Sequence, residues 1–81
     1  MSKKIRGREV VEDGDYVTFY MPSKSMAFAD DWLVVSNRPQ KPILGRILWN
    51  YELKEYCYHP YRGATTQDEL KEILEFVVKI N

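Results

Sequence analysis

Residues 65–81 read TTQDELKEILEFVVKIN and carry the clearest structural signal in the chain. Thr66 and Glu69 have the spacing of a capping box, in which hydroxyl and carboxylate each accept a hydrogen bond from a free backbone N–H at a helix start. Acidic residues in the first turn also suit the helix dipole. The pattern predicts a helix over about residues 67–79.

Aliphatic residues recur along this helix at three- and four-residue steps, which makes one apolar stripe. The stripe consists of Leu70, Ile73, Leu74, Val77 and Ile80. Phe76 and Val78 lie off its centre, and charged residues occupy the opposite side. Such a helix must bury its stripe against another element, and the upstream sequence indicates a sheet.

The upstream residues are typical of strands joined by turns. We expect strands at residues 16–21, 32–36, 43–49 and 54–59, and Val10-Val11 as the end of an earlier strand. Asp13-Gly14 favours a turn, two prolines mark a loop over 37–42, and residues 50–53 suit a hairpin connection. Short connections imply mostly antiparallel pairing. The sequence therefore predicts an α+β fold of two layers, in which an antiparallel sheet of four to five strands packs on one C-terminal helix.

Length and charge bound the class of protein. Eighty-one residues are enough for a single domain, 1–81, whose basic segment 1–8 we expect to be flexible. Twelve Lys+Arg balance twelve Asp+Glu, so bulk charge does not attract nucleic acid. One cysteine excludes an internal disulfide framework and a Cys-based zinc finger. No apolar run approaches about 20 residues, so we expect a cytoplasmic domain with no membrane span.

Side-chain parity in the last two strands sets which face meets the helix. We expect Ile47, Trp49, Tyr56 and Tyr58 to face it, because the reverse choice would bury Arg46. The outward side then carries Leu44, Arg46, Leu48, Glu55, Cys57 and His59. Leu44 and Leu48 would form an exposed apolar spot, suited to a second subunit or a partner.

Catalytic and metal-binding patterns are weak. Cys57 and His59 share a strand face, but a metal site needs three or four ligands and a nucleophile needs an orienting partner. Asp30-Asp31 could hold a cation or shift one pKa, but we interpret the pair as a solvated turn. The four glycines are scattered and form no phosphate loop. We expect no enzymatic activity, no metal and no cofactor.

The strand pair and helix resemble a recurrent pattern. Its residues here are Leu44-Gly45-Arg46-Ile47 with Trp49, then Tyr56-Cys57-Tyr58-His59-Pro60, then Leu70, Ile73, Phe76, Ile80 and Asn81. In this pattern a Gly-x-Ile-x-Trp strand returns through a Tyr-x-Tyr-x-Pro strand into a Leu-x-x-Ile-x-x-Phe helix. It is similar to small uncharacterised proteins encoded by phages and prophages. The match covers about residues 44–81 and departs at 50–53, where relatives often carry another tryptophan and arginine. The resemblance implies an accessory protein of a phage or mobile element in a bacterial cytoplasm.

Rings and cations interleave over residues 46–62, and this hairpin is the main candidate surface. We expect a non-catalytic protein that binds a host or phage macromolecule, in first place a protein, through the exposed sheet face and the hairpin 43–59. A homodimer is a further expectation. The expected contact residues are Arg46, Leu48, Tyr51, Lys54, Arg62 and Trp32. The alternative is a single-stranded nucleic-acid-binding module, because sheet rings stack on bases and cations meet phosphates.

Overall fold

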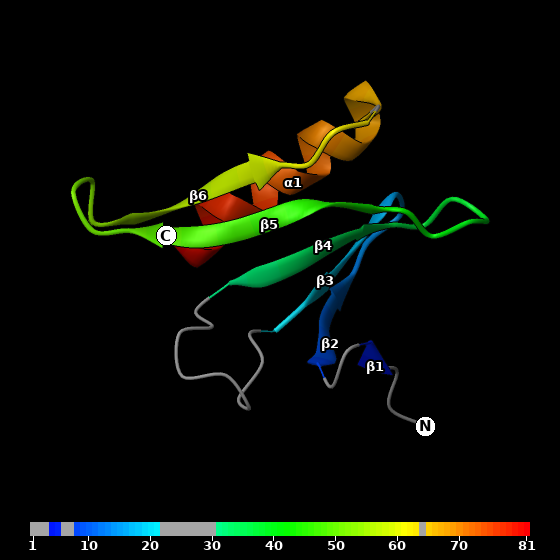
Figure 1. Cartoon of the computed structure of the whole chain (residues 1–81), viewed down its shortest axis with the longest axis horizontal. Helices are drawn as coiled ribbons and strands as arrows, with labels where there is room; N and C mark the ends of the chain where they lie inside the picture. Colours follow the sequence, from blue (N-terminus) through cyan, green and yellow to red (C-terminus); the bar gives the residue numbers. More distant parts are fainter. Residues whose placement is uncertain (1–3, 6–7, 22–30, 64) are drawn as a thin grey trace.

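The computed structural model describes residues 4–5, 8–21, 31–63 and 65–81. It is an α+β fold of two layers, a sheet with one helix across one face, as predicted (Figure 1). The elements are β1 (Lys4–Ile5), β2 (Arg8–Asp13), β3 (Val17–Tyr20), β4 (Trp32–Ser36), β5 (Ile43–Asn50), β6 (Glu55–Pro60) and α1 (Gln67–Ile80). The expected flexibility of segment 1–8 stays a prediction, because residues 1–3 and 6–7 lie outside the described residues.

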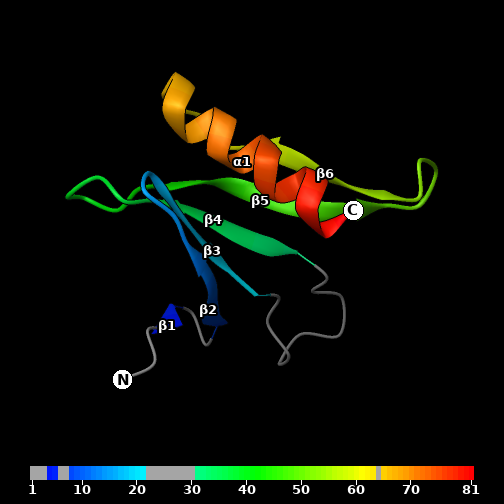
Figure 2. The same ribbon diagram turned by 180° about the vertical axis from the view of Figure 1, so that it is seen from behind.

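The sheet is an antiparallel meander in which each strand pairs with the next along the chain. The longest connection, residues 21–31 between β3 and β4, is shorter than the dozen or more residues that a parallel crossover needs, and sequence order and spatial order coincide. The sheet twists strongly, and β2 and β3 run at a steep angle to β5 and β6 (Figures 1 and 2). This twist separates the hairpin of β5 and β6 from the N-terminal strands.

The helix begins with the predicted capping box. Thr66 Oγ1 accepts from Glu69 N at 3.1 Å, and Glu69 Oε1 accepts from Thr66 N at 2.9 Å. At the other end, the amide of Asn81 pairs with the backbone of Tyr56 in β6, at 2.6 and 3.1 Å. Both ends of α1 are therefore fastened by side-chain hydrogen bonds, and the far one reaches the edge strand.

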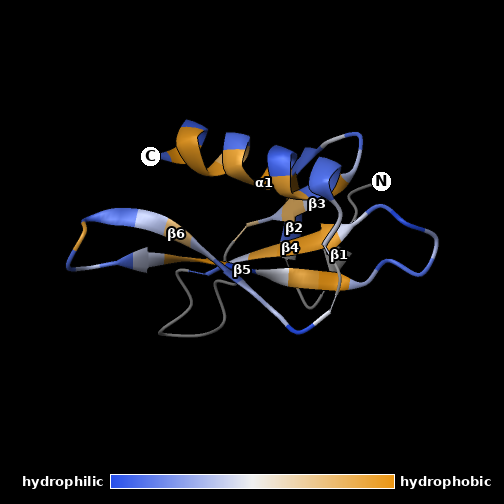
Figure 3. Ribbon diagram, turned by 90° about the horizontal axis from the view of Figure 1, so that it is seen from above, coloured by the Kyte–Doolittle hydropathy of each residue, from blue (hydrophilic) through white to orange (hydrophobic). Residues whose placement is uncertain are grey.

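The main core lies between α1 and the sheet. The rings of Phe19 and Phe76 stack with centroids 3.9 Å apart, and Ile73 packs beside them. Burial of one such side chain contributes about 1.5–3 kcal/mol. In Figure 3 the hydrophobic colour lies mostly on the sheet-facing side of α1 and on the strands below it.

The buried line of α1 differs from the predicted stripe. Phe76 is central, whereas Leu70 and Leu74 are exposed. The reason is Glu69, which is buried beside β4 and turns the helix so that positions 69, 73 and 76 face the sheet. Periodicity alone missed this rotation because it counts only apolar residues.

The face of the sheet away from α1 is also partly covered. Tyr20, Leu33 and Val35 form a second buried cluster there, with Val10 and Ile43 packed against it. The expected open sheet face is therefore absent over β3 and β4.

Leu44 corrects a second expectation. It is buried in the main core and not exposed on the outward face. The register between β4 and β5 shifts at this point: Val34 pairs with Gly45, but Val35 pairs with Ile43. Leu44 is the extra residue, and such a bulge moves its side chain to the same face as Ile47. The predicted apolar spot of Leu44 and Leu48 does not exist.

Candidate functional site

The hairpin of β5 and β6 is the longest paired segment of the sheet. Six residue pairs join the strands, from Gly45 opposite Pro60 to Asn50 opposite Glu55. Its tip extends beyond the body of the protein (Figures 1 and 2). The tip therefore presents side chains to solvent at a distance from the helix and the main core.

The conformation of the tip is set by local hydrogen bonds. Asn50 Oδ1 accepts from the backbone N–H of Glu52 at 3.0 Å and of Leu53 at 2.9 Å. Lys54 closes the turn with a left-handed backbone, at φ 55°. Tyr51 and Leu53 are 77% and 62% exposed. Two large hydrophobic side chains thus stand in solvent on a preformed turn.

The base of the hairpin holds Arg46 in internal contacts. Its Nη1 lies 3.2 Å from Oδ2 of Asp31, and its guanidinium lies 5.7 Å from the ring centroid of Tyr61. Asp31 is buried, so its interpretation as a solvated turn residue was wrong; Asp30 lies outside the described residues. Asp31 partly neutralises the half-exposed Arg46 that the sequence singled out.

The six expected contact residues do not form one surface. Tyr51 and Lys54 lie at the tip, whereas Arg46 and Arg62 lie near its base. Leu48 is half-buried and lies on the opposite face of β5 from the buried Ile47, because side chains alternate along a strand.

Trp32 sits on the helix side. Its ring meets Phe76 and Tyr56 edge-on, with centroids 5.5 and 6.3 Å apart, so it contributes to packing.

Several rings of the aromatic–basic hairpin also belong to the protein interior. Tyr56 and Tyr58 pack against the main core, as does the buried Ile47, which confirms their predicted orientation towards α1. Trp49 meets Tyr56 edge-on at 5.0 Å. Tyr58 donates from its hydroxyl to the carbonyl of Leu44 at 3.1 Å, and burial raises its pKa. These rings are partly buried and pack against other side chains of the protein.

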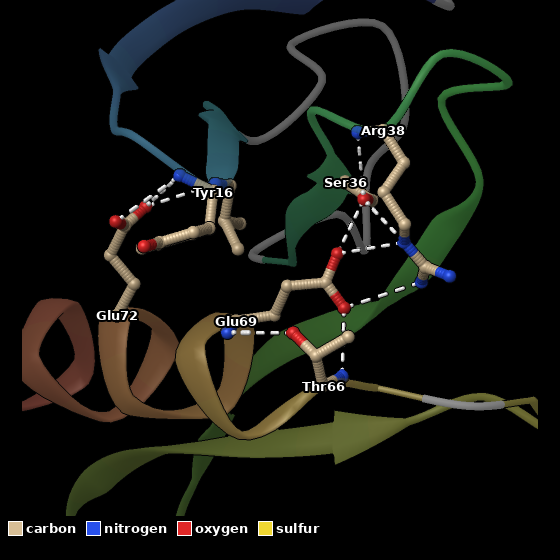
Figure 4. Close-up of polar contacts among 7 residues, drawn as sticks. Tyr16, Ser36, Arg38, Thr66, Glu69 and Glu72 are labelled. Atoms are coloured by element: carbon tan, nitrogen blue, oxygen red, sulfur yellow. Dashed lines mark hydrogen bonds and ion pairs between the residues drawn. The ribbon is translucent and has the colours of Figure 1, made fainter.

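A buried polar network joins the helix start to the end of β4 (Figure 4). The carboxylate of Glu69, only 2% exposed, accepts from Ser36 Oγ at 2.5 Å and from Arg38 at 3.0 and 3.2 Å, in addition to Thr66 N. Burial raises the pKa of Glu69, but the hydrogen bonds from Ser36, Thr66 and Arg38 together outweigh it, so this pKa lies below its usual value. The sequence indicated only the capping box, because Ser36 and Arg38 are distant in the chain.

A neighbouring carboxylate fastens the turn between β2 and β3. Glu72 accepts from the backbone N–H of Tyr16 at 3.1 Å and of Val17 at 2.9 Å (Figure 4). Between this turn and the helix start lies a hollow of about 290 Å³. It is lined by Asp15, Tyr16, Asn37, Arg38, Thr66, Asp68 and Glu69.

The polar groups of this network form hydrogen bonds with one another. The hydroxyl of Ser36 donates to Glu69 and accepts from both N–H and Nε of Arg38 at 3.0 Å, so it is fully engaged. A nucleophile would need a base that readily takes up its proton, whereas these hydrogen bonds lower the pKa of Glu69 and make its carboxylate a weak proton acceptor. Within the described residues, no group of three or more His, Cys, Asp or Glu side chains could hold a metal ion.

Comparison with known protein families, curated proteins and solved structures finds no match to this chain. In the parts of the chain that the structure describes, no helix is long and apolar enough to cross a membrane.

Proposed function

We propose that this chain is a non-catalytic protein-binding module whose main contact surface is the tip of the β5–β6 hairpin. The observation that carries the proposal is the exposure of Tyr51 and Leu53 on a turn that Asn50 holds in place. Large exposed hydrophobic side chains are common at protein contact sites. A preformed turn also loses little conformational entropy on binding, which favours affinity.

Charge favours a protein over a nucleic acid. Glu52 and Glu55 flank the tip and oppose phosphate, and Lys54 is the cation between them. Arg46 is already paired with Asp31. A nucleic-acid surface needs cations that track a backbone and rings that are open for stacking. The biological setting that we propose is an accessory role for a phage or mobile element in a bacterial cytoplasm.

Site-specific photo-crosslinking tests this proposal. A benzoylphenylalanine at position 51 is irradiated in a lysate of the source cell, with the same group at Val11 as the control, because Val11 is also exposed. We expect discrete protein adducts from position 51 that resist nuclease and disappear in the Leu53→Asp background. Adducts that vanish with nuclease, or equal adducts from both positions, would contradict the proposal.

A further inference from the structure

The outer side of α1 carries a second apolar line that nothing in the described protein covers. Leu70, Leu74 and Val78 are 41%, 51% and 76% exposed. They follow one another at four-residue steps, so they lie one above the next along the helix. This line is separate from the buried line of Ile73 and Phe76, and we call it the outer stripe.

Two charges border the outer stripe on one flank. Lys71 and Glu75 are both exposed and stand one turn apart. The other charges of the middle and end of α1 are engaged towards the sheet: Glu72 accepts from the turn before β3, and Lys79 lies 2.6 Å from Glu12 in β2. Lys71 and Glu75 are therefore placed to meet a molecule that covers the stripe.

The stripe and its flank are complementary to themselves. In an antiparallel pairing of two α1 helices about a two-fold axis at Leu74, Leu70 of one copy faces Val78 of the other, and Leu74 faces its equivalent. Lys71 then lies opposite Glu75 of the second copy, displaced along the axis by two residues, or about 3 Å. Both side chains are long enough to bridge this offset, and symmetry makes the contact twice.

We infer that two copies of this chain associate through the outer stripe, with α1 helices antiparallel and Leu74 on the two-fold axis. The apolar line supplies the attraction, and the two Lys71–Glu75 contacts fix the antiparallel direction. The interface lies on α1 and leaves the hairpin tip exposed, so the inference stands apart from the proposed function.

Sedimentation velocity over a range of concentrations tests the dimer with the full chain. We expect a reversible dimer that Leu74→Glu weakens at least about 100-fold, because two carboxylates would face each other across the axis. The matched control is Leu53→Glu, an exposed leucine at the hairpin tip, which should leave the dimer unchanged. Far-UV circular dichroism checks that both variants fold. A chain that stays monomeric at about millimolar concentration, or a dimer that responds to Leu53→Glu alone, overturns the inference.

A charge exchange tests the orientation. Lys71→Glu and Glu75→Lys should each weaken self-association, because each places like charges opposite one another in both contacts. An equimolar mixture of the two variants should form a heterodimer, since one copy then carries two carboxylates and the other two ammonium groups on this flank. A contact between residues 71 and 75 within one helix would not change on mixing, so a gain on mixing reports contacts between two copies. No gain on mixing contradicts the antiparallel arrangement.

Discussion

Replacing Glu69 by alanine should cost a large part of the stability of this domain. The change removes the acceptor for Ser36 Oγ, for Arg38 and for Thr66 N. Ser36 Oγ still accepts from Arg38, but its buried O–H donor is left without an acceptor, which costs about 1–3 kcal/mol. The loss of the hydrogen bond from Thr66 N, which is one half of the capping box, adds about 0.5–1 kcal/mol. The ion pair adds little, because Arg38 is 43% exposed and water replaces the carboxylate there.

The expected sum is about 1.5–4 kcal/mol, against a total of about 5–15 kcal/mol for a typical domain. The assay is urea unfolding followed by circular dichroism at the helix band. Asp68→Ala is the matched control: Asp68 lies in the same first turn but is exposed, so its loss should cost only the dipole interaction of about 0.3–1 kcal/mol. If Glu69→Ala costs no more than Asp68→Ala, the buried network does not stabilise the fold and the reasoning is refuted.

Three further predictions follow from the same contacts. The pKa of Glu69 is lowered in the folded protein, so its contribution to stability is complete above the ordinary glutamate pKa and is lost as pH falls through the lowered value. The free energy of unfolding of Glu69→Gln should therefore fall less steeply with acid than that of the unmodified protein, and parallel curves of unfolding free energy against pH would contradict the assignment. Leu44→Ala should cost about 2–4 kcal/mol and Leu48→Ala about 1 kcal/mol in urea unfolding, because only Leu44 is fully in the core; equal costs would argue against the bulge. Asn81→Ala should speed hydrogen exchange at the Tyr56 amide, its direct partner, while the amide of Phe76 keeps its protection; an unchanged rate at Tyr56 would show that the edge is not capped.

Local signals predicted the elements well. The capping box placed the start of α1, and alternation with turn residues placed β3 to β6 within one residue at each end. These features depend on residues close together in the chain. The orientation of Ile47, Tyr56 and Tyr58 was also predictable, because parity is a property of each strand.

The misplaced residues depend on contacts between distant segments. Leu44 changed face because of a one-residue bulge, which no local pattern marks. The sequence indicates Glu69 only as a capping-box residue and Asp31 only as part of a solvated turn, because their partners Ser36 and Arg46 come from other elements. The candidate site was found in part: Tyr51 and Lys54 were named, but Leu53 was missed, although a leucine in a hairpin turn is itself an unusual choice. Two residues of the outer stripe, Leu70 and Leu74, belong to the apolar stripe that the sequence predicts for the core, whereas Val78 lies off the centre of that stripe.

The pairing of Asn81 with Tyr56 affects how other chains can approach the sheet. An edge strand normally exposes N–H and C=O groups that can template a foreign strand. On β6 these groups of Tyr56 are occupied by the Asn81 amide, and Pro60, four pairing positions further along, has no N–H to give. Backbone groups point alternately towards and away from the neighbouring strand in an antiparallel pair. Between Tyr56 and Pro60, only Tyr58 therefore directs its N–H and C=O away from β5, and one residue is too short for strand addition. The β6 edge of the sheet therefore resists fibril-like growth, even though the ring of Tyr51 is exposed at the nearby turn.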